Sequence, residues 1–434
     1  MTTFDAIIPT LVEIFQHAET EKPSVRPILI NRDLNGRVRL IVDQKWENDD
    51  GAKIELHKLA HLMKEKLEPH AYPVEQALLF ETDFEQALQG EITFLLEGTQ
   101  DVFIVDRLAM EGNWASISAP STSTPRIVFF SIKGGVGRST ALASAAWALA
   151  EDGKRVLVLD LDLESPGLSS SLLPEDRRPI FGIVDWLVED LVDNDQSVFE
   201  DMVATSDLSH NGEILVVPAH GVDPGEYIAK LGRVWMPKMN SHGERESWSQ
   251  RLGRLLEKLE KRWTPDVILI DSRAGIDEVA SACLTDLSAS TILLFAIDGD
   301  QTWSGYRILF QHWLKSGVAL EIRERLQAVG AMIPELDAAG YFEGLLENSW
   351  DTFSDKLYDE IQAGKIATDD IWSFDEMDES APHFPWQVRW FRSFAALKSL
   401  HGRLAAIDGE EVRTVFGPLI EGIMHLVEAE RSKP

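Results

Sequence analysis

The chain has 434 residues, with 72 Asp and Glu against 41 Lys and Arg, so its formal net charge at pH 7 is −31. This excess of acids disfavours non-specific binding to nucleic acid and to anionic membranes, because both need clustered Lys and Arg. A single cysteine excludes an internal disulfide, and no apolar run approaches the ~20 residues of a membrane span. The N-terminus lacks the pattern of a signal peptide, so we expect a cytoplasmic protein of two or three domains.

Residues 1–117 predict a small α+β domain. Helical spacing covers residues 4–17 and 52–67, and a further strand covers 101–106. Two apolar strands, 26–31 and 37–42, flank an Asn-Gly turn, which indicates a hairpin. The segment carries no metal-ligand spacing and no nucleophile–base pair, so we interpret it as an adaptor or regulatory domain.

Residues 118–125 are small, polar or proline and have no period, which is typical of a linker. Residues 126–434 then form the main predicted domain. Its apolar runs alternate with helical segments, which predicts a doubly wound, mainly parallel sheet in an α/β fold. The predicted strands are 127–130, 156–161, 214–217, 267–270, 292–297 and 328–333.

A glycine-rich segment, residues 131–140, follows the first of these strands and precedes a helical run. Glycines let backbone amides approach an anion, and a helix N-terminus adds partial positive charge. Ser139, at the start of the helix, places a hydroxyl where a phosphate-bound Mg²⁺ would lie. This order of strand, turn and helix predicts a phosphate-binding loop.

Two later strands end in acids. Asp160 and Asp162 close the strand at 156–161, and Asp271 closes the strand at 267–270. Open parallel sheets bind ligands at the carboxyl ends of their strands, so we expect these acids beside the glycine-rich loop.

The glycine-rich segment resembles the deviant Walker A box of the ParA/MinD group of P-loop ATPases, K-G-G-x-G-K-[ST]-T. The matching positions are Lys133, Gly134, Gly135, Gly137, Ser139 and Thr140, and Val136 occupies the variable position. The resemblance implies that ATP and Mg²⁺ are the ligands and that residues 133–140 contact the phosphates. It also implies that Lys133 reaches across a homodimer to the partner's nucleotide.

Further site roles follow from the resemblance. Asp162 would position the attacking water, while Ser139, Asp160 and Asp271 would lie on the magnesium side. Gly275 would turn its amide toward a γ-phosphate. Arg273 is unusual in this second switch segment and is either a trans-acting cation or a plain surface residue. ATP is favoured by the resemblance alone, because the sequence has neither an adenine-reading asparagine nor an N-K-x-D motif.

Arg138 departs from the pattern, because it replaces the lysine that holds the β- and γ-phosphates. Arginine keeps the charge but is a longer, planar fork, so we expect hydrolysis to suffer more than binding. One hypothesis is an ATP- and Mg-dependent dimer that hydrolyses slowly and controls a protein partner. The alternative is a scaffold or localisation protein that binds nucleotide without hydrolysing it. Such a scaffold could belong to a bacterial defence system.

Three features lie outside these motifs. Trp386 and Trp390 are four apart on an expected helix, where packing or base stacking would explain them. Cys283 is expected on a buried helix face. Residues 417–431 predict an amphipathic but acidic helix.

Overall fold

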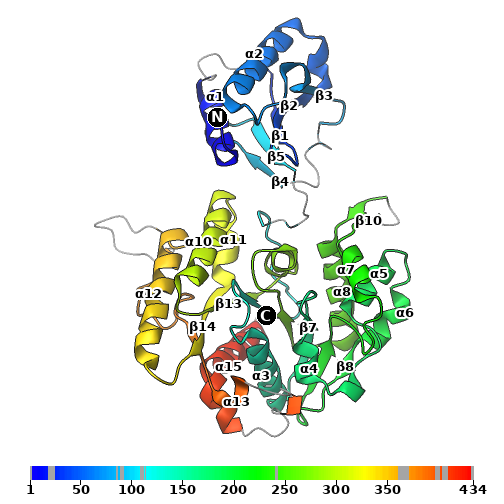
Figure 1. Ribbon diagram of the computed structural model, residues 1–434, viewed down its shortest axis with the longest axis vertical. Coiled ribbons are helices and arrows are strands. Elements are labelled where there is room, and N and C mark those ends of the chain that lie inside the picture. The colour runs from blue at the N-terminus through cyan, green and yellow to red at the C-terminus, as the bar shows by residue number, and fades with distance from the viewer. Residues whose placement is uncertain are drawn as a thin grey trace. The chain divides into compact units, whose positions relative to one another are not determined.

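The computed structural model describes residues 2–17, 25–84, 87, 92–107, 112, 114–239, 243–359, 371–395, 401–402 and 409–431. The chain folds into two compact units, Met1–Glu111 and Gly112–Pro434 (Figure 1). Within the described ranges, every helix is too short or too polar to cross a membrane.

The first unit is built on a five-stranded sheet with the order β3-β2-β1-β5-β4. The strands are β1 (Ile28–Arg32), β2 (Val38–Asp43), β3 (Leu78–Glu81), β4 (Ile92–Leu95) and β5 (Val102–Asp106). Helices α1 (Ile7–His17) and α2 (Asp50–Leu67) pack their apolar residues against one face of the sheet. The predicted hairpin is confirmed, since β1 and β2 pair antiparallel and Gly36 takes a φ of 74° in the turn.

The second unit contains an eight-stranded sheet with the order β15-β14-β13-β6-β12-β7-β9-β8. Every pairing in it is parallel except that of the edge strand β8. The strands are β6 (Arg126–Ser131), β7 (Arg155–Asp160), β8 (Ala204–Thr205), β9 (Glu213–Val217), β12 (Val267–Asp271), β13 (Thr291–Ala296), β14 (Leu326–Ile333) and β15 (Trp386–Arg389). The doubly wound α/β prediction and its six strands are therefore confirmed.

Helices cover both faces of this sheet, because successive strand residues point to opposite sides. In β6, Ile127 and Phe129 pack with α3 (Arg138–Glu151), α4 (Leu168–Leu172) and α15 (Gly409–Arg431). Val128 and Phe130 point to the other face and pack with α5 (Ile183–Asp190), α8 (Trp248–Trp263) and α10 (Asp300–Lys315). Figure 1 shows α15 beside α3, and the two helices are in contact. The other helices in the described part of the unit are α6 (Gln196–Phe199), α7 (Tyr227–Val234), α9 (Glu278–Ser281), α11 (Ala319–Ile322), α12 (Ala338–Lys356) and α13 (Arg392–Ala395). A two-stranded ribbon, β10 (Lys238–Met239) and β11 (Arg245–Glu246), lies between α7 and α8 in the chain.

The expected helix around Trp386 is wrong. Trp386 begins β15, which pairs parallel with β14 at the edge of the sheet, and its ring lies against Gly422 of α15. An aromatic pair four apart is equally compatible with a short strand, and here pairing with β14 decides the outcome. The predicted C-terminal helix is confirmed as part of α15.

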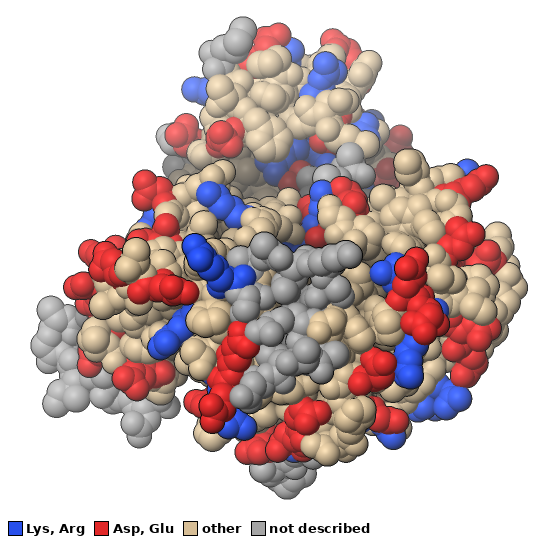
Figure 2. Space-filling model, turned by 60° about the horizontal axis from the view of Figure 1, so that its bottom comes forward, with Lys and Arg blue, Asp and Glu red and all other residues tan. Residues whose placement is uncertain are grey.

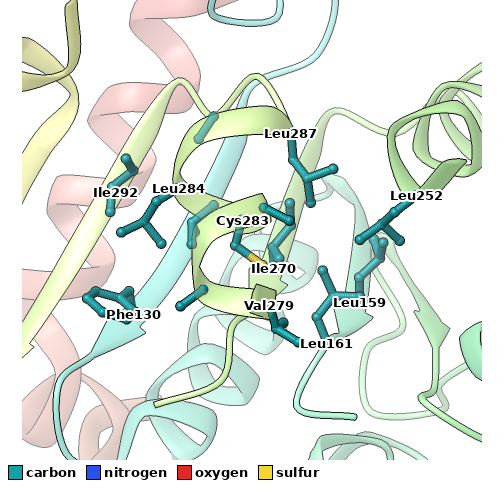
Figure 3. Packing of buried hydrophobic residues seen from close by; sticks show 14 of the residues in the cluster. Phe130, Leu159, Leu161, Leu252, Ile270, Val279, Cys283, Leu284, Leu287 and Ile292 are labelled. Atoms are coloured by element: carbon teal, nitrogen blue, oxygen red, sulfur yellow. The ribbon is translucent and has the colours of Figure 1, made fainter. Parts of the chain in front are cut away.

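Cys283 follows α9 on a buried helical turn, as predicted. Figure 3 shows it in the apolar packing with Ile270, Val279 and Leu284. Burial raises the pKa of its thiol to about 12, so the side chain acts as a small apolar group.

The segment 118–125 lies within the second unit. The amides of Ser118 and Ser121 donate to the carbonyls of Thr285 and Ser288 at 2.8 and 2.9 Å. Backbone hydrogen bonds thus attach this stretch to the second unit, although its side chains show no apolar periodicity. The amino-acid composition alone does not predict these bonds.

Candidate nucleotide-binding site

The glycine-rich loop runs from the end of β6 to the first turn of α3. Gly135 and Gly137 have φ values of 76° and 80°, in the left-handed region that favours glycine. No heavy atom lies within 4 Å of the point that a Cβ would occupy at Gly134 or Gly135, so the loop borders open space. Val136 is buried beneath it. The loop therefore exposes bare backbone at a helix N-terminus, the arrangement that binds phosphate.

The predicted acids converge on the same edge of the sheet. Asp160 and Asp271 are register partners at the ends of β7 and β12, and β12 pairs with β6, which leads into the loop. Both side chains are buried, at 0% and 1% exposure. Parallel strands bring their carboxyl ends together, so the sheet itself explains this clustering.

Arg138, the first residue of α3, turns its side chain into the acids. Its Nε donates to Asp271 Oδ1 at 2.7 Å, and its Nη1 donates to Ser131 Oγ at 3.2 Å. Its Nη2 lies 3.6 Å from Asp162 Oδ2. The guanidinium is 7% exposed and thus joins the helix start to two strand ends.

Asp160 organises the loop that follows β7. Its Oδ1 accepts from the amide of Asp162 at 3.3 Å, and its Oδ2 accepts from the amides of Gly167 and Leu168 at 3.2 and 3.1 Å. Burial is the main cause that raises the pKa of Asp160 to about 7, and the charges of Asp271 and Asp162 act in the same direction.

This pKa leads to a pH-dependent stability. The folded protein holds the Asp160 proton more tightly than the unfolded chain, whose pKa is near 3.8. The contribution of Asp160 to stability is therefore fully present below that unfolded value and is lost as the pH rises to about 7. We expect the melting temperature of Asp160→Asn to fall less between pH 5 and pH 7.5 than that of the wild type. Parallel slopes in differential scanning calorimetry would contradict the assignment.

Arg273 bridges the two loops that follow β7 and β12. Its guanidinium contacts Glu164 at 2.6 Å and Asp277 at 3.0 Å, and its side chain is 32% exposed. Gly275, with a φ of 97°, donates its amide to the carbonyl of Ser131 at 2.9 Å. The predicted contact of Gly275 with a γ-phosphate thus requires this hydrogen bond to open.

Lys133, Ser139 and Thr140 are each partly exposed. Unlike Arg138 and Arg273, Lys133 forms no ion pair with any residue that the structure describes. Its charge is therefore available to a ligand or to a second chain.

The structure adds residues that the sequence analysis missed. Tyr227 of α7 donates its hydroxyl to the carbonyl of Leu163 at 2.6 Å, so α7 supports the loop after β7. The Met332 sulfur would lie 3.6 Å from a Cβ on Gly137, which places Met332 beside the phosphate loop. Glu164, in the loop after β7, forms an ion pair with Arg273. Long-range contacts of this kind leave no local sequence signal.

The carboxylates at this edge of the sheet are already engaged by groups of the same chain. Asp160 is engaged by backbone amides, and Asp271 accepts from Arg138. Asp162 Oδ1 is buried without a hydrogen-bond partner in the described structure, yet its other oxygen faces the guanidinium. Among the described residues, no group of three or more His, Cys, Asp or Glu is suited to hold a metal. The carboxylates as arranged do not fit a protein-held ion, so magnesium stays a prediction from the resemblance.

The fold and the loop define the class of protein: an α/β nucleotide-binding protein of the P-loop type, with its acids at the carboxyl edge of a parallel sheet. The family model of the CobQ/CobB/MinD/ParA nucleotide-binding domain matches residues 127–409, which is well over half of the chain. The chain belongs to this family, and the predicted relationship to ParA/MinD-type P-loop ATPases is confirmed.

Several solved structures resemble the chain. The pNOB8 ParA bound to non-specific DNA is 18% identical, with a TM-score of 0.44, over 71% of this chain and 98% of that chain. The septum site-determining protein MinD of Pyrococcus horikoshii OT3, solved with Mg-ADP, is 19% identical, with a TM-score of 0.42, over 71% and 100%. Cobyrinic acid a,c-diamide synthase of Mycobacterium smegmatis, solved with ADP and magnesium, is 21% identical, with a TM-score of 0.39, over 55% and 85%. No curated protein matches the chain.

Proposed function

We propose that the chain binds ATP at residues 133–140 and works as a nucleotide-switched homodimer that hydrolyses slowly and controls a protein partner. The observation that carries the nucleotide site is the bare loop at Gly134 and Gly135, open at the N-terminus of α3 and beside Asp162. Backbone amides and a helix dipole select an anion, and the family match supports a nucleotide.

The dimer is supported by the state of Lys133. In the described part of the chain, the other cations of the site are paired, Arg138 with Asp271 and Arg273 with Glu164, whereas Lys133 has no ion-pair partner. A partly exposed lysine without an ion-pair partner can therefore contact a nucleotide bound to a second copy. Size-exclusion chromatography with light scattering, with and without ATP, tests this proposal. A chain that stays monomeric with ATP, in wild type and Asp162→Ala alike, would overturn it.

The partner is proposed to be a protein. Net charge disfavours nucleic acid and membranes, and Figure 2 shows one face on which Asp and Glu gather in groups with Lys and Arg between them. In this proposal the unit Met1–Glu111 acts as the adaptor or regulatory domain, and the ATPase domain works in the cytoplasm.

A second candidate is the scaffold that holds nucleotide without hydrolysis. It is favoured by the contact of Arg138 with Asp162, because the residue predicted to position water already faces a cation of its own chain. In that case ATP is a structural ligand, and the function of the protein is to bind a partner through its surface.

Phosphate release separates the two candidates. For the switch, we expect a slow rate above buffer background that falls at least about tenfold in Asp162→Ala, since a group that positions water or accepts its proton contributes to the rate-limiting step. Asp152→Ala, an exposed acid that follows α3, is the matched control and should leave the rate unchanged. A background rate that Asp162→Ala leaves unchanged would favour the scaffold.

A further inference from the structure

We infer that the Arg138 guanidinium is the resident cation of the carboxylate cluster, so that the site accepts nucleotide with little dependence on a divalent metal. The part that concerns nucleotide rests on the proposed function above. The part that concerns the cation rests on the nucleotide-free protein and can be tested without any ligand.

The geometry is that of a cation built into the site. One planar group reaches Asp271 Oδ1 at 2.7 Å, Ser131 Oγ at 3.2 Å and Asp162 Oδ2 at 3.6 Å. Asp271 is 1% exposed and Asp162 is 19% exposed. The guanidinium therefore lies among oxygens that a magnesium ion would otherwise face.

Burial makes this cation necessary. Two carboxylates removed from water need a counter-charge, and a guanidinium whose donors diverge can serve both of them and a hydroxyl at once. A lysine is a single point of charge on a flexible stem and would not hold the same three oxygens in this planar geometry. Arg138 is also fixed at the first position of α3, between the open loop and the acids.

A second cation at the same oxygens is disfavoured. A divalent ion bound to Asp271 Oδ1 would lie next to the Nε that already donates to this atom, and like charges repel strongly at such a separation in a buried site. The metal must therefore displace Arg138 or bind elsewhere, whereas the phosphates can still occupy the loop at residues 134–137.

The first experiment uses the nucleotide-free full chain and Mg²⁺ or Mn²⁺ as the only probes. Wild type should show no change in melting temperature on adding 5–10 mM Mg²⁺ (on the order of a saturating concentration for a weak site). Arg138→Ala should melt at a lower temperature, and Mg²⁺ should restore part of that loss by neutralising Asp271 and Asp162, which the substitution leaves without their cation. Mn²⁺ titrated under electron paramagnetic resonance should bind Arg138→Ala more tightly than wild type by about tenfold or more.

Two further variants, Arg138→Lys and Arg262→Ala, are titrated with the same metals. Arg138→Lys keeps the charge but lacks the planar fork, so its acids should bind Mn²⁺ more tightly than those of the wild type. Arg262, whose pair with Glu200 is exposed, reports any non-specific effect of removing an arginine. Wild type that binds Mn²⁺ as tightly as Arg138→Ala would overturn the inference. If Arg138→Ala fails to fold, the wild-type and Arg138→Lys titrations still decide.

A second experiment measures the affinity of a fluorescent ATP analogue in Mg²⁺ and in EDTA. We expect wild type to lose less than about threefold in EDTA, and Arg138→Lys to lose about tenfold or more. An equal, large loss in both would overturn metal independence. No binding in either buffer would overturn the proposed function itself, while the metal titrations would still report on Arg138.

Discussion

Replacing Lys133 by alanine should abolish ATP-dependent dimerisation while leaving nucleotide binding to the monomer within a few-fold of wild type. Lys133 is partly exposed and, in the described structure, makes no ion pair that its loss would break. The backbone of residues 134–140 and the N-terminus of α3 would still cradle the phosphates. Light scattering reports the oligomeric state, and a titration with a fluorescent ATP analogue reports affinity on the same sample.

Lys45→Ala is a suitable control for Lys133→Ala, because Lys45 is 57% exposed and lies in the first unit. It should change neither measurement. A Lys133→Ala protein that binds ATP more weakly and keeps its oligomeric state would show that the lysine contacts its own nucleotide, which refutes the trans-acting role.

Among the substitutions proposed for this protein, Arg251→Ala should cause the largest loss of folding stability. Arg251 of α8 is 0% exposed, and its Nε donates to Asp190 Oδ2 at 2.7 Å. Its other nitrogens donate to the carbonyls of Leu187 and Met236. Removing one partner of a buried ion pair leaves the other charge buried without a counter-charge. This lowers the free energy of unfolding by about 3–5 kcal/mol. Arg254 and Lys238 also contact Asp190, so we expect the lower end of that range.

Thermal unfolding followed by tryptophan fluorescence checks this prediction, since Trp186 and Trp248 are buried in the same apolar core. The melting temperature of the second unit should fall by roughly 6 °C or more. Arg262→Ala, with its exposed partner Glu200, should leave the melting temperature unchanged. Equal effects of the two variants would show that the Asp190 cluster does not carry this part of the fold.

Local pattern predicted most of the second unit. Continuous apolar runs of four to seven residues indicated the strands that became β6, β7, β9, β12, β13 and β14, because a strand buried on both faces needs apolar side chains at every position. The glycine-rich segment and the acids at strand ends indicated where a phosphate would bind. Both signals lie within about ten residues of chain, so one sequence suffices to detect them.

The edge strand β15 was not predicted, because its pairing depends on residues far away in the sequence. β15 is four residues long, and its partner β14 lies more than fifty residues earlier in the chain. A short segment with aromatics at a spacing of four satisfies helix and strand equally, and only the open edge of the sheet selects the strand.

The sequence by itself determined the class of fold, the phosphate loop and the presence of an arginine where the family pattern has lysine. Only the tertiary structure decided what that arginine does: Arg138 contacts Asp271, 133 residues further along the chain, and faces Asp162. It also decided that Asp160 serves the backbone of its own loop and that Arg273 bridges Glu164 and Asp277. A motif specifies which groups are present, but the pairing of charges depends on which strands become neighbours and on how deeply their ends are buried.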